Sequence, residues 1–291
     1  MLSPRDDYEK QCAQIEEDLS QVVPEPLRAR VLRFFRPAIL LSTSPASGEL
    51  LPLASKFGGL PDAPLGFEWP SFGGEPLGFV AQLNLAELSQ FDLDGRLPKV
   101  GLLSFWTNGA WGDAEDFGSW RVFHFKSEDW QRLEEPASET WWKRWLHGKR
   151  FPSFRCAPVL AQVWATLPDR WEDTEFQGEE FDPIVAGALS PLPENYGHRM
   201  FGFPDSVQED VREACARDWN RFLALPQADR LGLSAQHDQA QWQDFELLLQ
   251  IKEDDNAKMQ WGDLGAVYFL IRSVDLRAQR FERCWFVLQS C

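Results

Sequence analysis

Two short segments of the sequence show the same order of residue types, and each ends in an aspartate. Residues 55–62 read SKFGGLPD and residues 198–205 read HRMFGFPD. If the fold brought Asp62 and Asp205 together, the two carboxylates could serve as general acid and general base, the pair that hydrolyses glycosidic bonds. We favour the structural alternative, because aspartate bonds its own downstream backbone in ordinary turns. The electrostatic partners in an active site would be the cations of the two segments, Lys56 and Arg199.

The residues that follow each segment also match. Both halves continue with a strand that contains a glutamine and then with a strand that begins at a glycine. Alternation of apolar and polar residues in the first of these strands places Gln82 and Gln250 opposite the core-facing row. Each half therefore reads as a Gly-Pro loop that leads into an antiparallel pair of strands. The predicted strands are FVAQLNL (79–85) and GLLSFW (101–106) in the first half, and LLLQIKE (247–253) and GAVYFLI (265–271) in the second.

These elements predict an α+β fold that is internally duplicated, with mainly antiparallel β-sheets and flanking helices. Helical spacing of apolar residues places N-terminal helices within residues 1–36. Residues 37–291 are expected to form a single domain, with pseudo-repeats at about 55–125 and 198–291.

The second half has an additional predicted helix between its loop and its first strand. Ser206 and Glu209 match the capping box that begins many helices. Apolar residues then recur at intervals of three and four, including Cys215, until Pro226 ends the run. We expect Cys215 to be a small buried hydrophobic residue without a catalytic role.

The chain is strongly acidic, which bears on its partners. Its 291 residues contain 45 Asp and Glu against 29 Lys and Arg, a formal net charge of −16. Such a chain is repelled by nucleic acid and by anionic lipid, and it attracts basic proteins. We therefore expect no direct nucleic-acid binding, although acidity that serves only solubility is the alternative. The basic, tryptophan-rich segment 141–155 is expected to pack as a helix through its indoles.

Three acidic regions are candidates for contact with a basic protein. Residues 169–182, DRWEDTEFQGEEFD, mix acids with large aromatic side chains, which could anchor a partner or could pack into the core. The turns Trp111-Gly112-Asp113 and Trp261-Gly262-Asp263 are each joined to further acids, and neither fits a calcium loop. The candidate toxin-binding residues are Asp113, Glu115, Asp116, Trp171, Glu172, Asp173, Glu175, Glu179, Glu180, Asp182, Glu253, Asp254 and Asp255.

The sequence does not contain the motifs of common enzymes, H-E-x-x-H, G-x-S-x-G, Walker A or G-x-G-x-x-G. Its five cysteines form no C-x-x-C pair and its four histidines are scattered, so we expect no metal, no cofactor and no disulfide framework. The first residues do not match a signal peptide, and apolar runs fall short of the roughly 20 residues of a membrane span. We expect a cytoplasmic protein without membrane contact.

Several of these motifs occur together in the YwqG-like family, which the chain resembles from about Ala38 to its end. The resemblance rests on SKFGGLPDAP with Trp69-Pro70, FVAQLNLAEL, GLLSFW, DFELLLQI and MQWGDLGAVYFLIRSVDL. It implies a mainly antiparallel α+β fold and no established enzymatic activity. Members of this family also occur near genes for polymorphic secreted toxins, which implies an immunity role for some of them.

We therefore expect an immunity protein that binds a cognate basic toxin, a nuclease of the kind delivered by type VI secretion, and covers its substrate-binding face. The acidic loops would set the association rate and the aromatic side chains the lifetime of the complex. The alternatives are a hydrolase that uses Asp62 and Asp205, and a scaffold or regulator.

Overall fold

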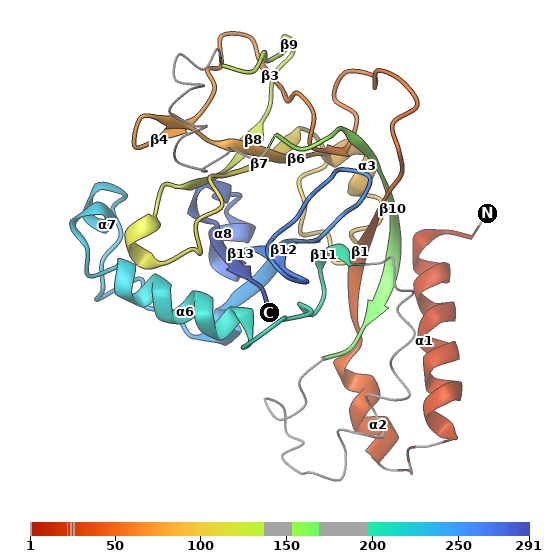
Figure 1. Ribbon diagram of the computed structural model, residues 1–291. Helices are drawn as coiled ribbons and strands as arrows, with labels where there is room; N and C mark the ends of the chain where they lie inside the picture. Colours follow the sequence, from red (N-terminus) through yellow and green to blue (C-terminus); the bar gives the residue numbers. More distant parts are fainter. Residues whose placement is uncertain (1, 22, 24, 26, 137–152, 169–196) are drawn as a thin grey trace.

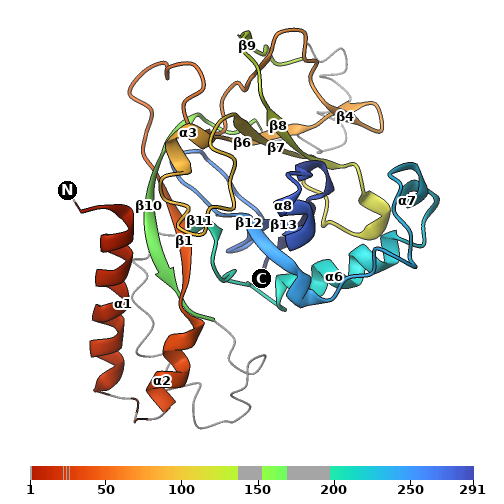
Figure 2. The same cartoon turned by 180° about the vertical axis from the view of Figure 1, so that it is seen from behind.

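One large antiparallel β-sheet organises the chain (Figures 1 and 2). The computed structural model describes residues 2–21, 23, 25, 27–136, 153–168 and 197–291. The strand order of the large sheet is β14-β13-β12-β11-β1-β10-β2-β6-β7-β8, and the sheet is nearly closed. Its strands are β1 (Arg36–Thr43), β2 (Lys56–Phe57), β6 (Gly78–Asn84), β7 (Leu102–Thr107), β8 (Trp120–Phe125), β10 (Ala157–Thr166), β11 (His198–Phe201), β12 (Phe245–Lys252), β13 (Ala266–Arg272) and β14 (Trp285–Gln289).

Short strands and helices complete the described part of the chain. Two small sheets pair β3 (Asp62–Pro64) with β9 (Trp130–Arg132), and β4 (Ser71–Phe72) with β5 (Glu75–Pro76). The α-helices are α1 (Pro4–Ser20), α2 (Leu27–Val31), α3 (Leu85–Leu88), α6 (Val211–Phe222), α7 (Pro226–Arg230) and α8 (Ser273–Arg277). Single 3-10 turns lie at Leu32–Phe34, Ala114–Asp116, Trp242–Asp244 and Phe281–Arg283. The mainly antiparallel sheet with few helices fits the predicted α+β class broadly.

The predicted strands are confirmed to within one residue at most ends. The alternation placed Gln82 and Gln250 opposite the core-facing row, and the structure adds that this second face is not open to solvent. Both glutamines are fully buried, and β6 is buried along almost its whole length. The reason is that the Gly-Pro loops fold back over the second face of the sheet and cover it.

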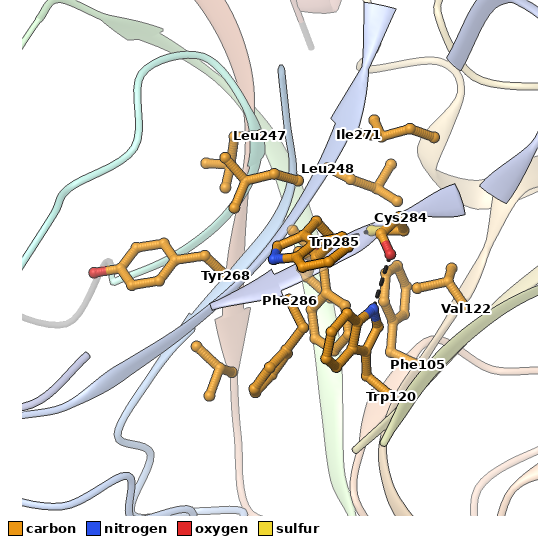
Figure 3. Packing of buried hydrophobic residues seen from close by; sticks show 14 of the residues in the cluster. Phe105, Trp120, Val122, Leu247, Leu248, Tyr268, Ile271, Cys284, Trp285 and Phe286 are labelled. Atoms are coloured by element: carbon orange, nitrogen blue, oxygen red, sulfur yellow. Dashed lines mark hydrogen bonds between the residues drawn. The ribbon is translucent and has the colours of Figure 1, made fainter. Parts of the chain in front are cut away.

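Aromatic side chains connect the two ends of the large sheet, where β14 and β13 lie at one end and β7 and β8 at the other. Trp120 in β8 donates its Nε1 hydrogen to the Cys284 carbonyl, just before β14, at 2.9 Å (Figure 3). Phe105 in β7 meets Phe269 in β13 edge to face, with ring centroids 5.0 Å apart. One core therefore joins the two ends of the strand order, which is why the sheet curls instead of remaining flat.

Helix α1 packs beside β10 on the outside of the sheet (Figure 1). It begins at a capping box between Ser3 and Asp6, with Pro4 in its first turn. Gln11 fixes its position, because its amide donates to the Val163 carbonyl at 3.1 Å and accepts from the Ala165 amide at 3.1 Å.

The predicted capping of helix α6 is wrong. The sequence placed the cap at Ser206, but the helix begins at Val211 and its N-cap is Asp210, whose carboxylate accepts from the Arg212 amide at 2.7 Å. The residues before it are bound elsewhere: the side-chain carbonyl of Gln289 accepts from the backbone amides of Val207 and Gln208, both at 3.0 Å. A contact across more than 80 residues thus overrides the local motif. Cys215 is fully buried in α6, as predicted.

Candidate functional site

The first Gly-Pro loop holds a buried ion network around Asp62. Lys56 and Asp62 are each only 2% exposed, and the Asp62 carboxylate accepts hydrogen bonds from the Leu53 amide at 2.9 Å, Gln82 Nε2 at 2.7 Å and Arg132 Nε at 2.9 Å. Burial alone would raise the pKa of Asp62, but the bonds from Arg132 and Gln82 outweigh it and lower that pKa. Asp62 is therefore an ionised structural anchor with its acceptor sites occupied.

The second Gly-Pro loop makes equivalent contacts. The Asp205 amide donates to Gln250 Oε1 at 2.8 Å, as the Asp62 amide donates to Gln82 Oε1 at 2.8 Å. Each cation also donates to the carbonyl four residues after it. Arg199 Nη1 donates to the Phe203 carbonyl at 3.2 Å, and Lys56 Nζ donates to the Leu60 carbonyl at 2.7 Å. The two buried glutamines thus clamp the two turns in the same way.

The fold does not bring Asp62 and Asp205 together. Strands β2 and β11 are separated by β10 and β1, and antiparallel pairing at each step makes them run in opposite directions. Phe57 at the end of β2 is level with Ala157 of β10, whereas Phe201 at the end of β11 is level with Trp164 of the same strand. These two levels are seven residues apart along β10, which corresponds to about 23 Å between the points where the two loops leave the sheet. The two loops leave opposite ends of the sheet, whereas a glycosidase pair needs carboxylates within about 10 Å.

The turn Trp111-Gly112-Asp113 is fixed to the last strand. The Leu288 amide donates to the Trp111 carbonyl at 3.1 Å, and Trp285 Nε1 donates to the Gly112 carbonyl at 3.1 Å. Gly112 has φ +98°, and a Cβ atom there would collide with the Phe286 carbonyl oxygen. The indole of Trp111 stays outside, 58% exposed.

The turn Trp261-Gly262-Asp263 is fixed to the same C-terminal segment. The Cys291 amide donates to the Asp263 carbonyl at 2.9 Å. Leu264 follows with φ +50°, an uncommon conformation for a side chain of its size, and it is 72% exposed. Because Leu288 and Cys291 are three residues apart, the two turns attach about 10 Å apart along the chain.

The candidate residues of the first turn differ in accessibility. Asp113 and Glu115 are exposed, and Glu115 forms an ion pair with Arg221 of α6 at 3.2 Å. Asp116 is half-buried, and burial together with the nearby charges of Asp113 and Glu115 raises its pKa.

The candidate residues before the second turn line a cavity of about 750 Å³, together with Thr43, His198 and Leu264. Asp254 is only 9% exposed, and its carboxylate binds His198 Nε2 at 3.1 Å and Thr43 Oγ1 at 2.5 Å. Burial opposes ionisation, but the bonds from His198 and Thr43 lower the pKa of Asp254 to about 2. Glu253 is half-buried and Asp255 is exposed, so Asp255 is the most accessible of the three.

Thr43 is a residue of this cavity that sequence reasoning missed. It is 211 residues from Asp254, and no pattern in the sequence links them. His198 drew attention only as a member of the repeated loop; its Nδ1 atom is buried and finds no hydrogen-bond partner in the described part of the chain.

Part of the candidate set lies outside the described residues: Trp171, Glu172, Asp173, Glu175, Glu179, Glu180 and Asp182, with most of the basic segment 141–155. Within the described ranges, no group of three or more histidine, cysteine, aspartate or glutamate side chains could hold a metal ion. No helix in those ranges has the length and apolarity that a bilayer crossing requires.

Comparison with known proteins adds one finding. A family model described as "Domain of unknown function (DUF1963)" matches residues 55–291, which include both Gly-Pro loops and both acidic turns. No curated protein matches the chain.

Proposed function

The chain belongs to the DUF1963 family, whose function is unknown, and we propose that it is an immunity protein. In this proposal it binds a cognate secreted bacterial toxin, a nuclease, and covers the toxin's basic substrate-binding face. The YwqG-like resemblance and the gene neighbourhoods of that family support the assignment. The matching contacts of Gln82 and Gln250 support an internal duplication of the scaffold that carries the binding surface.

The observation that carries the proposal is a pair of exposed apolar side chains among exposed acids. Trp111 is 58% exposed and Leu264 is 72% exposed, on two turns that bind one C-terminal segment. Asp113 lies two residues after Trp111 and Asp263 directly precedes Leu264, and both aspartates are exposed. We call these four residues the acidic-turn surface. Large apolar anchors surrounded by charge are typical of protein interfaces.

The two anchors suffice for a meaningful contribution to binding. Covering both would remove on the order of 250 Å² of apolar surface, which corresponds to about 6 kcal/mol before the cost of association. The carboxylates would act on the encounter rate, since a basic nuclease face is attracted to a chain with net charge −16.

Rigidity of the turns also favours binding. Gly112 leaves no space for a side chain against Phe286, and Gly262 has φ +115° with Ser290 Cβ only 2.7 Å from the position of an added Cβ atom. Turns held this closely lose little freedom when a partner binds, so more of the contact energy contributes to affinity.

Co-expression with the neighbouring gene, which the proposal expects to encode the toxin, tests the proposal. We expect the parent chain to restore growth, and the quadruple variant Trp111→Ala, Asp113→Lys, Asp263→Lys, Leu264→Gly to fail. The matched charge control is Glu16→Lys with Glu17→Lys, two exposed positions of α1, which packs on β10 five strands from β14.

Kinetics with the purified toxin separate the two contributions. The two lysine substitutions should slow association and flatten its salt dependence, whereas Trp111→Ala should speed dissociation and weaken binding by about thirtyfold, or about 2 kcal/mol. The proposal is wrong if the quadruple variant protects as well as the parent chain, or if the neighbouring gene product is not toxic.

A further inference from the structure

A second cavity of about 500 Å³ lies where the start of β1 meets the first turn of α6. Three arginines from distant parts of the chain line it: Arg36, the first residue of β1, Arg96 from the loop after α3, and Arg212 from α6. The three guanidinium groups gather positive charge around one cavity in a chain with net charge −16, and the carboxylates of Asp94 and Glu246 also line it. The volume is within the range of small-molecule sites.

Aromatic rings hold the guanidinium groups in place. The Arg36 Cζ atom lies 4.9 Å from the centroid of Phe203, a ring that is 6% exposed. Arg212 Cζ is 6.0 Å from the same ring and 4.6 Å from the ring of Trp242. A guanidinium on an aromatic face keeps its N–H edge available for an anion, and that edge matches a carboxylate or a phosphate in shape.

The three arginines differ in how their charges are balanced. Arg212 forms an ion pair with Asp210, which also caps α6, at 2.5 Å. Arg96 lies within 3.6 Å of three carboxylates, those of Asp92, Asp94 and Glu246. Arg36 makes no ion pair with any described residue and is exposed at the mouth of the cavity, held by its ring contact. Arg36 therefore has its charge available for a ligand.

The surroundings of Arg36 determine the kind of ligand. Phe34, Phe35 and Trp242 also line the cavity and are each half-buried, so they present apolar surface to whatever occupies it. Asp94 and Glu246 would oppose an anion with several charged groups, because their negative charges are only partly balanced by Arg96. A ligand with one small charged group and a flat apolar body satisfies both conditions.

We propose that this cavity binds a small aromatic anion, an aryl carboxylate or an aryl phosphate, whose charged group pairs with Arg36 and whose ring lies against Phe34, Phe35 and Trp242. The inference is independent of the immunity proposal, since no residue of the cavity belongs to the acidic-turn surface. A negative result for toxin binding would therefore not count against this cavity, and a negative result for the cavity would not count against toxin binding.

Isothermal titration of the full-length chain with four probes tests the inference. The probes are 1-naphthoate, 1-naphthyl phosphate, the neutral 1-naphthamide and inorganic phosphate. We expect at least one naphthyl anion to bind at least tenfold more tightly than naphthamide and than inorganic phosphate, and the comparison of naphthoate with naphthyl phosphate identifies the preferred charged group. Equal binding of naphthamide, or binding of inorganic phosphate as tight as that of the naphthyl anions, would overturn the proposal.

Two variants of equal charge locate the site. Arg36→Gln should weaken binding of the naphthyl anion by about tenfold and leave naphthamide unchanged, whereas Arg33→Gln, an exposed position three residues earlier, should change neither by more than twofold. Circular dichroism shows whether each variant is folded. If a folded Arg36→Gln variant binds the anion like the parent chain, the assignment is refuted.

Discussion

Replacement of Gln82 by leucine should destabilise the fold more than the equivalent change at Gln250. Gln82 is fully buried, and its side chain makes hydrogen bonds with the Asp62 amide at 2.8 Å, the Ala54 carbonyl at 2.9 Å and the Asp62 carboxylate at 2.7 Å. Leucine has a similar volume but leaves all three groups without this partner. Each unsatisfied buried group costs about 1–3 kcal/mol, so we expect a loss of about 3–5 kcal/mol.

Gln250 supplies the internal comparison. It is also fully buried, but it bonds the Asp205 amide and the Gly197 carbonyl, both at 2.8 Å, and it makes no bond to the Asp205 carboxylate. The Asp205 side chain is also 38% exposed, so water can replace part of what is lost. We expect Gln250→Leu to cost about 2–3 kcal/mol.

Urea denaturation monitored by circular dichroism at pH 7 measures both values. Gln260→Leu, at an exposed position, is the control for the change of residue type and should stay within about 0.5 kcal/mol of the parent chain. The reasoning fails if Gln82→Leu costs less than about 1 kcal/mol, or if Gln250→Leu costs more than Gln82→Leu. Either result would mean that the glutamines do not clamp the loops.

Three further substitutions test other parts of the structure. The pKa of Asp254 is about 2 against an ordinary 3.8, so its ionised form stabilises the fold above about pH 4, and that stability is lost as the pH falls through 2. In urea titrations, Asp254→Asn should therefore cost about 2 kcal/mol at pH 6 and clearly less at pH 2. An equal cost at both pH values would contradict this reasoning. Asp275 is fully buried within ion-pair distance of three arginines, including Arg272 at 2.6 Å. The substitution Asp275→Asn should therefore lower the free energy of unfolding by about 3–5 kcal/mol. A loss below about 1 kcal/mol would show that these charges are solvated. Gly112→Ala should cost clearly more than Gly109→Ala in thermal melts, because both have positive φ but only Gly112 meets another backbone; equal melting temperatures would disprove that close approach.

Local sequence patterns predicted the elements well where the signal was short-range. Alternation located β6 and β12, because successive side chains of a strand point to opposite faces. An initial glycine followed by apolar residues located β7 and β13, which are buried along their whole length. Helical spacing located α6, although the capping motif named the wrong first residue. That motif was overridden because Gln289, more than 80 residues later, binds the amides that would have begun the helix.

The candidate sites were predicted less completely. Gln82 and Gln250 accept a hydrogen bond from the Asp62 amide and the Asp205 amide in the same way, but the two loops that carry these aspartates leave opposite ends of the sheet. Acidity and turn type identified Asp113 and Asp255 as exposed. The same patterns gave no sign that Asp254, next to Asp255, is buried against His198.

Local patterns and composition were enough to predict the strands, the glycine turns and the negative charge, because each depends on residues within a few positions of one another or on composition alone. Which polar groups are buried, and which of them contact one another, depends on how the whole chain folds. Thr43 reaches Asp254, and Arg36, Arg96 and Arg212 surround one cavity, only because the order of strands in the sheet brings distant segments side by side. That order is set by packing of the whole core, and no local pattern encodes it.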